Sequence, residues 1–103
     1  MTSPTIYDFD WDAAKAAANV AKHQVHFGQA MAVFRDPLAL TLYDEAHSQY
    51  EERWITIGLD AEGFLLLVVH TFQYTTPINV LIRMISAREA TRRERADYEN
   101  EPR

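Results

Sequence analysis

The chain has 103 residues, of which 48% are hydrophobic and 24% are charged, and its formal net charge is −5. This length and composition predict a single folded domain spanning residues 1–103 and exclude an intrinsically disordered chain. The absence of cysteine excludes disulfides, thiolate zinc sites and thiol nucleophiles, and it is consistent with a reducing cytoplasm.

The first expected elements are a short strand and a helix. Ile6 to Trp11 alternate aromatic or aliphatic side chains with aspartates, a pattern typical of an edge strand. Asp12 has the position of an N-cap, and the alanine-rich segment from there to about Gln24 has high helix propensity. Asn19 lies largely away from the expected packing face. We expect close packing through the alanines of one face, which are Ala14, Ala17, Ala18 and Ala21.

A second helix and a sheet follow. The helix is predicted by apolar residues at the i, i+3, i+4, i+7 spacing, which are Phe27, Ala30, Met31 and Phe34. Asp36-Pro37 ends it. Four later runs are rich in β-branched and aromatic residues and predict strands: Leu38 to Tyr43, Arg53 to Leu59, Phe64 to Thr71 and Ile78 to Ile85. Their short connections, including an expected hairpin turn at Asp60 to Gly63, predict an antiparallel meander with Phe64 to Val69 in a central strand.

Thr91 and Glu94 have the capping-box spacing and are expected to begin a last helix that ends at about Glu99. The predicted fold class is therefore α+β, with a short N-terminal strand, two helices, a four-stranded antiparallel sheet and a C-terminal helix. We expect no secretory signal, because residues 1–8 lack a basic and an apolar stretch, and no membrane span, because the longest apolar run is too short. These features favour a cytoplasmic location.

Positive charge is concentrated near the C-terminus. The segment Arg83 to Arg95 holds five arginines beside only Glu89 and Glu94, so it carries +3 while the rest of the chain carries −8. Guanidinium groups bind phosphate and carboxylate bidentately, which favours an anion site here, and a solvated helix face is the alternative. Arg53 can be interpreted in two ways. In the first it forms a surface ion pair with the preceding glutamates. In the second, which we favour, it is held with Arg83 on a rigid sheet face and has a function there.

The histidines suggest acid–base chemistry more than metal binding. His23, His26, His47 and His70 have no thiolate or paired carboxylate at a known ligand spacing, so we expect no metal and no cofactor. His23, at the expected helix end, is either a C-terminal cap or a general acid or base. His70, within an apolar strand, is expected to be a buried histidine with satisfied hydrogen bonds. The chain also lacks a glycine-rich phosphate loop and a nucleophile elbow.

Several segments, in order along nearly the whole chain, resemble one family. They are Phe9-Asp-Trp-Asp, Lys15-Ala with Asn19 and Lys22-His23, Val33-Phe34-x-Asp36-Pro37, His47-Ser48-x-x-Glu51-Glu52-Arg53, Ile57-Gly58, Arg83-x-Ile85-Ser86-Ala87-Arg88, and Ala90-Thr91-Arg92-Arg93-Glu94-Arg95-x-x-Tyr98-Glu99. This pattern is similar to that of the BrnT toxins of type II toxin-antitoxin systems. The chain departs from it at His26 and Gly28 and in the longer segment Tyr74 to Asn79.

The resemblance implies a RelE-like fold and a ribonuclease that arrests translation and growth. It also implies a BrnA-like antitoxin with a ribbon-helix-helix DNA-binding half, through which the pair represses its own operon. The residues permit metal-independent RNA cleavage by the substrate's own 2′-hydroxyl. For this chemistry we expect His23 as acid or base, three arginines as catalytic cations, and further basic side chains that bind RNA. The cations are Arg53, Arg83 and Arg88, and the RNA-binding residues are Lys22, Arg92 and Arg93. The alternative is a catalytically inactive protein-binding domain that serves as antitoxin partner or co-repressor.

Overall fold

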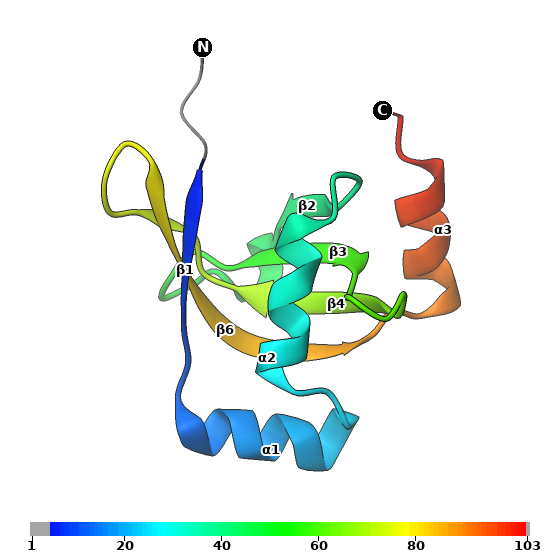
Figure 1. Cartoon of the computed structure of the whole chain (residues 1–103), viewed down its shortest axis with the longest axis horizontal. Coiled ribbons are helices and arrows are strands. Elements are labelled where there is room, and N and C mark those ends of the chain that lie inside the picture. The colour runs from blue at the N-terminus through cyan, green and yellow to red at the C-terminus, as the bar shows by residue number, and fades with distance from the viewer. Residues whose placement is uncertain (1–4, 103) are drawn as a thin grey trace.

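The computed structural model describes residues 5–102. Half of the segment expected to lack a secretory signal, residues 1–4 of 1–8, lies outside this range. In chain order the elements are β1 Ile6–Asp10, α1 Ala13–His23, α2 Phe27–Ala30, the 3-10 helix η1 Met31–Arg35, β2 Leu40–Tyr43, the 3-10 helix η2 Glu45–His47, β3 Trp54–Leu59, β4 Leu65–His70, β5 Gln73–Tyr74, β6 Asn79–Glu89 and α3 Arg92–Asn100 (Figure 1). The predicted α+β class is confirmed, with additional short elements at β5 and η2.

The strands form one sheet in the order β1-β6-β4-β3-β2, with β5 pairing with β6 beside this path. The pairs β2–β3, β3–β4 and β4–β6 are antiparallel, which confirms the expected meander. β4 lies between β3 and β6, so the expectation of a central strand is also confirmed. β1 is an edge strand, as expected, and it runs parallel to the first half of β6. The sequence pattern gave no direction for that pairing.

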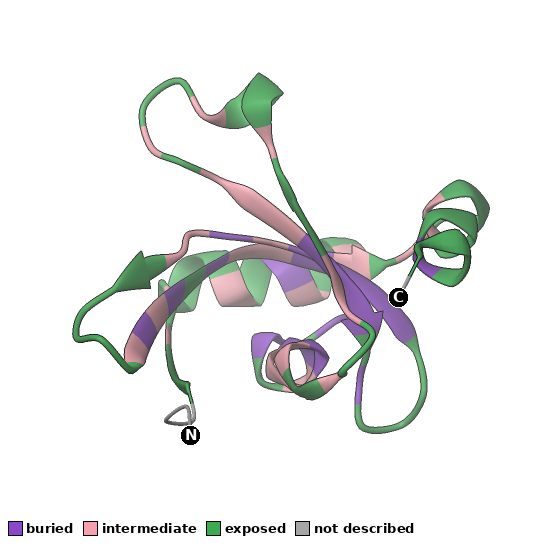
Figure 2. Ribbon diagram, turned by 90° about the horizontal axis from the view of Figure 1, so that it is seen from above, coloured by how far each residue is buried: buried purple, intermediate pink, exposed green. Residues whose placement is uncertain are grey.

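The two faces of the sheet have different coverings. α1, α2 and η1 pack on the face that we call the core face (Figure 1). There buried apolar side chains of α2 and η1, with the partly buried Ala16 of α1, meet those of β4 and β6. The opposite face carries a smaller apolar cluster of Ile57, Leu65, Leu67 and Tyr98, the last of which comes from α3. Figure 2 shows that buried residues concentrate in the strands at the centre, between the two coverings. We call the second face the arginine face, for the residues described next.

A β-bulge in β6 places Arg83 and Arg88 on the same face. His70 pairs with Met84, but Val69 pairs with Ser86, so Ile85 is an extra residue in β6. Side chains alternate between faces along a regular strand, so residues five positions apart would point to opposite faces. One extra residue reverses that relation. The burial pattern agrees, because Val80, Ile82 and Met84 are buried at intervals of two and the next buried residue is Ala87, three positions on.

Arg53 lies just before β3 and not within it, which corrects the expected start of this strand. Its backbone is nevertheless fixed, because its N–H donates to Ser48 Oγ at 3.0 Å and its carbonyl accepts from the N–H of Asp44 at 2.8 Å. Ile55 and Ile57 pair with the β4 residues of the arginine face. Arg53 continues their alternation, so it belongs to the arginine face as well.

Asp12 caps α1, as expected, by accepting from the N–H groups of Ala14 and Lys15 at 2.7 and 3.3 Å. The expected packing face of this helix is wrong: Ala14, Ala17, Ala18 and Ala21 are exposed, and Asn19 is buried. The Asn19 amide donates to the carbonyls of Val25 and Ala87 at 2.9 and 2.8 Å, and its oxygen accepts from the N–H of Ala87 at 3.0 Å. The Asn19 side chain therefore fixes α1 on β6 through hydrogen bonds from both its amide nitrogen and its oxygen. These hydrogen bonds offset the cost of burying a polar group, which the sequence pattern does not reveal.

Most of the remaining local predictions agree with the structure, but β6 extends four residues beyond its predicted end at Ile85, to Glu89. The predicted second helix is present as α2 followed by η1, and it ends at Asp36. The turn between β3 and β4 closes through Asp60, whose Oδ1 accepts from the N–H groups of Glu62 and Phe64 at 2.9 Å. Gly63 supplies the positive φ of 89° that this turn requires. α3 begins with the predicted capping box of Thr91 and Glu94.

Candidate active site

A cavity of about 330 Å³ opens on the arginine face, between η2, the central strands and the start of α3. Its floor is apolar and its rim is charged. The apolar residues are Ile55, Leu67, Val69 and Ile85, and the polar ones are Asp44, His47, Arg53, Ser86, Arg88 and Glu94. Two of the predicted catalytic cations, Arg53 and Arg88, therefore share one cavity, and the bulge together with the alternation of β3 is what brings them there.

Arg53 has unused binding capacity. Its Nε is buried and has no hydrogen-bond partner among the described residues, and the nearest carboxylate oxygen, Glu51 Oε1, is 3.9 Å away. An N–H donor at that distance forms an ion pair but no hydrogen bond. A buried donor without a partner carries a desolvation cost that an incoming oxyanion would relieve.

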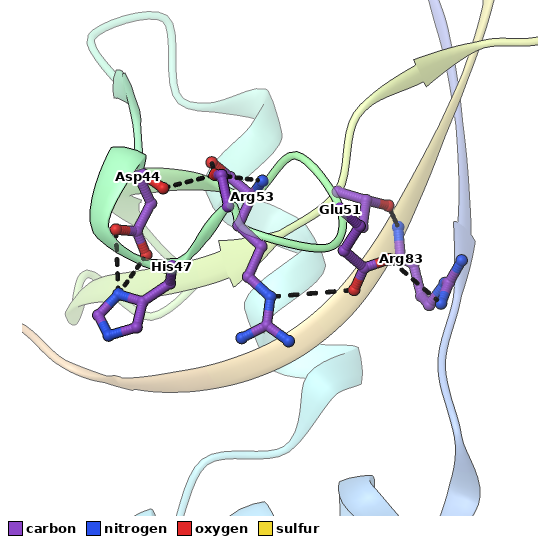
Figure 3. Close-up of polar contacts among 7 residues, drawn as sticks. Asp44, His47, Glu51, Arg53 and Arg83 are labelled. Carbon is purple, nitrogen blue, oxygen red and sulfur yellow. Dashed lines mark hydrogen bonds and ion pairs between the residues drawn. The ribbon is translucent and has the colours of Figure 1, made fainter.

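Glu51 links Arg53 to Arg83. Its second oxygen, Oε2, lies 3.8 Å from an Nη1 atom of Arg83. Figure 3 shows Glu51 between the two arginine side chains, with His47 on the other side of Arg53. All three side chains of this bridge are partly exposed, at 34% for Arg53, 38% for Glu51 and 53% for Arg83. The predicted residue Arg83 is therefore connected to the cavity through a carboxylate, although it does not line the cavity itself.

Arg88 is held in a fixed orientation by Glu94. Its two terminal nitrogens donate to the two carboxylate oxygens at 2.7 and 2.9 Å. Hydrogen bonding to Arg88 lowers the pKa of Glu94 to about 2, and the same pairing raises the pKa of Arg88. Glu94 Oε1 also accepts from the N–H of Thr91 at 2.8 Å, which couples the arginine to the helix cap. A guanidinium has five N–H donors, so this pairing leaves donors for another oxyanion.

His47 and Asp44 form a hydrogen-bonded pair at the rim. Nδ1 of His47 lies 3.1 and 3.0 Å from the two carboxylate oxygens of Asp44. Asp44 is mostly covered, with 11% of its side chain exposed, whereas the imidazole is 69% exposed. A carboxylate that accepts from Nδ1–H leaves Nε2 as the proton acceptor, which is the arrangement of a general base. Sequence reasoning did not select His47 or Asp44 as site residues, although His47 begins one of the segments on which the resemblance rests.

His23 and Lys22 do not line this cavity. They line a neighbouring one of about 200 Å³, which shares Ile85 and Ser86 with the first. His23 ends α1, as expected, so it stays a predicted acid or base one cavity away from Arg53. Arg92 and Arg93 are exposed at the start of α3. Neither lines the cavity, and their predicted contact with RNA stays a prediction.

One other cavity has less suitable chemistry. A larger cavity of about 440 Å³ lies between α1 and α2, and its lining of apolar side chains and one histidine includes no arginine or carboxylate. Within residues 5–102 no group of three or more histidine and acidic side chains could hold a metal ion. No helix in this range is long and apolar enough to cross a membrane.

Comparisons with known proteins found a matching family and a similar solved structure. Residues 11–94 match the family described as the ribonuclease toxin BrnT of type II toxin-antitoxin systems. The chain is also similar to the ribonuclease toxin BrnT of Brucella abortus, known from a 1.1 Å crystal structure. The identity is 21% and the TM-score 0.59, and the match covers 85% of this chain and 100% of the other. This likeness shows a shared fold. A comparison with curated proteins found no match.

Proposed function

Because this chain belongs to the BrnT family, the ribonuclease toxins of type II toxin-antitoxin systems, we propose that the cavity on the arginine face cleaves RNA without a metal ion. Cleavage of this kind would inhibit translation and arrest growth. The observation that carries the proposal is the convergence of Arg53, Arg88 and the His47–Asp44 pair on one cavity. The 2′-hydroxyl needs a base to remove its proton, and the phosphate needs fixed positive charge in the transition state. These residues supply both.

In the proposed reaction the 2′-oxygen of the RNA attacks the adjacent phosphorus. Nε2 of His47 takes the hydroxyl proton, while Asp44 holds the imidazole through Nδ1 and stabilises the cation that forms. The bond from phosphorus to the 5′-oxygen breaks, and that oxygen takes a proton from solvent. The products are a 2′,3′-cyclic phosphate and a 5′-hydroxyl. No protein nucleophile and no metal-bound water takes part.

The arginines stabilise the charge that grows on the nonbridging oxygens. Arg53 has the clearest role, because its buried Nε lacks a hydrogen bond and the residue lines the cavity. Arg88 is positioned by Glu94 and contributes a second fixed cation. Positive groups that are already oriented in the free enzyme are effective because they need no reorganisation during the reaction. Lys22, Arg92 and Arg93 would contact flanking phosphates.

The test is a comparison of two arginine variants in buffer that contains EDTA. Arg53→Ala should reduce RNA cleavage by roughly 10²- to 10³-fold, the loss typical of a removed transition-state donor, and should relieve growth arrest. Arg35→Ala is the matched control, because Arg35 lies on η1, on the other side of the sheet. Equal activity of the two variants at equal soluble level would remove Arg53 from the mechanism. A strict need for added magnesium or zinc would refute the metal-free reaction.

Two histidine variants assign the proton transfer in the same assay. His47→Ala should lose most of the cleavage, and His23→Ala should retain more of it, because only His47 shares the cavity with Arg53. The reverse order would restore His23 to the role that the sequence predicted. If the wild-type protein binds its antitoxin but cleaves no RNA, and the variants behave in the same way, the protein is better described as an inactive co-repressor.

The family implies an antitoxin partner. We propose a BrnA-like protein with a ribbon-helix-helix half that binds operator DNA, so that the toxin reaches DNA only through its partner and the pair represses its own operon. The concentration of arginines between Arg83 and Arg95 supports a partner segment that is acidic or helical and covers this surface. Inhibition would then be direct occlusion of the residues that hold RNA.

A further inference from the structure

The Glu51 bridge has the geometry of an occupied anion site. Each carboxylate oxygen faces a different arginine, Oε1 toward Arg53 at 3.9 Å and Oε2 toward Arg83 at 3.8 Å (Figure 3). Both separations are too long for hydrogen bonds, so the carboxylate lies between the cations without being fixed to either. The two arginines come from distant parts of the chain, the end of a loop and the middle of β6, and neither forms any other ion pair among the described residues.

A phosphodiester group suits this position better than a carboxylate does. It carries one negative charge on two nonbridging oxygens, as a carboxylate does, but its tetrahedral centre spreads those oxygens farther apart. Arginine forks bind such groups through pairs of N–H donors. Shorter contacts would also give the buried Nε of Arg53 the hydrogen bond that it lacks.

We propose that Arg53 and Arg83 form a subsite for one phosphodiester group and that Glu51 occupies this subsite in the free protein. Substrate enters by displacing the Glu51 carboxylate toward solvent. This inference rests on the proposed function for the identity of the substrate, and it adds a residue that competes with RNA at the entrance of the cavity.

The exposure of the bridge makes the displacement easy. Ion pairs between partly exposed groups contribute little, about 0.2 to 1 kcal/mol, so RNA does not have to break a strong contact. The same weakness limits the effect of removing the carboxylate. Neutralising Glu51 should therefore tighten nucleic-acid binding severalfold and not by orders of magnitude.

Glu52 is a matched control for Glu51. It is the next residue in the same loop, it is exposed, and among residues 5–102 it forms no ion pair. Glu51→Gln and Glu52→Gln remove the same charge from the same segment. A difference between them therefore measures occupation of the subsite and not the general gain from a less acidic protein.

The probe is a short single-stranded oligodeoxynucleotide, which lacks the 2′-hydroxyl and so cannot be cleaved. Its dissociation constant is measured at low salt for wild-type protein, both glutamine variants and the Arg53→Ala forms of wild type and Glu51→Gln. Glu51→Gln should bind about fivefold more tightly than wild type, and Glu52→Gln should differ by less than about twofold. In the Arg53→Ala background the effect of Glu51→Gln should largely disappear.

Three results would overturn the inference. If both glutamine variants bind the oligodeoxynucleotide equally more tightly, the effect of Glu51 is one of general charge. If Glu51→Gln binds it more weakly, Glu51 holds the arginines in place. If Glu51→Gln has the same effect without Arg53, Glu51 acts at another place than the proposed subsite. Cleavage of an RNA of the same sequence is measured in parallel. Tighter DNA binding by Glu51→Gln without RNA cleavage by wild type would support the subsite and refute the proposed function. Cleavage without that tightening would do the opposite.

Discussion

At the scale of single residues, His70 shows how burial decides the state of a titratable group. Its side chain is fully buried, Nδ1 lies 2.7 Å from the carbonyl oxygen of Thr71, and Nε2 lies 2.7 Å from Thr56 Oγ1. A carbonyl only accepts, so Nδ1 carries the proton and Nε2 accepts from the Thr56 hydroxyl. Thr41 continues the chain through its hydroxyl at 3.0 Å from that of Thr56. The sequence-based expectation of a buried, satisfied histidine is confirmed.

This burial predicts a dependence of stability on pH. Desolvation lowers the pKa of His70 from 6.5 to about 4. As the pH falls below about 6.5 the unfolded chain binds the proton first, so the contribution is complete above that value and is lost as the pH falls to about 4. Its size is about 3 kcal/mol. Urea unfolding between about pH 7 and pH 4 should show this fall in wild type.

His70→Gln should flatten that pH dependence even though it lowers the stability itself, and His26→Gln, at an exposed position, should not. Glu94, whose pKa is lowered to about 2, begins to lose its contribution only below about pH 4.5, at the acidic end of this range, and that loss is common to wild type and both variants. Identical pH profiles for wild type and His70→Gln would show that the imidazole is not the responsible group.

At the scale of elements, the strand runs could be predicted because hydrophobic alternation and turn residues are local signals. The bulge could not. Ile85 and Ser86 fit a regular strand as well as a bulged one, and only pairing with Val69 reveals the extra residue. The parallel partner of β1, the two-residue β5 and the three-residue η2 are likewise set by contacts distant in sequence. Because His47 lies in η2, the same limit hid a candidate site residue.

The contact between η1 and β3 supplies a test at this scale. A Cβ atom added to Gly58 would lie 3.0 Å from the carbonyl oxygen and 3.1 Å from the Cβ of Val33, so one backbone would have to move. Gly58→Ala should therefore destabilise the protein by about 1 to 3 kcal/mol. Gly28→Ala is the control, because nothing lies within 4 Å of its added Cβ and its φ is compatible with alanine.

The free energy of unfolding in urea separates the two variants. Gly28→Ala should leave it unchanged or raise it by up to about 1 kcal/mol, because alanine has the higher helix propensity. If Gly58→Ala were as stable as Gly28→Ala, close packing of η1 on β3 would not be the reason for glycine at this position.

At the scale of the whole molecule, charge is segregated. The segment from Arg83 to Arg95 carries +3 within a chain of −5, and part of it forms the arginine face while Arg92 and Arg93 extend it along α3. Sequence alone located this concentration of charge. It could not show which carboxylates these arginines pair with. Arg88 pairs with Glu94, six residues later, and Arg83 pairs with Glu51 from across the sheet.

This asymmetry predicts how an acidic antitoxin segment would associate. Arg92→Glu with Arg93→Glu should slow association at low salt by about tenfold and make it less sensitive to salt, because electrostatic steering acts mainly on the on-rate. Lys15→Glu with Arg35→Glu makes the same change in net charge on other elements and should have a smaller effect. Association rates at low and high salt test this. An unchanged salt dependence would place the antitoxin on another surface.

The extra residue in β6 also determines which changes this protein could accept during evolution. Substitution of Ile85 leaves the count of residues between Arg83 and Arg88 intact, so the two side chains keep a common side. Deletion of one residue anywhere between them turns one arginine toward the helices. Insertion of a pair of residues preserves their relation. Homologous proteins that conserve the cavity should therefore differ in this segment by residue type, or in length by even numbers, and rarely by a single position.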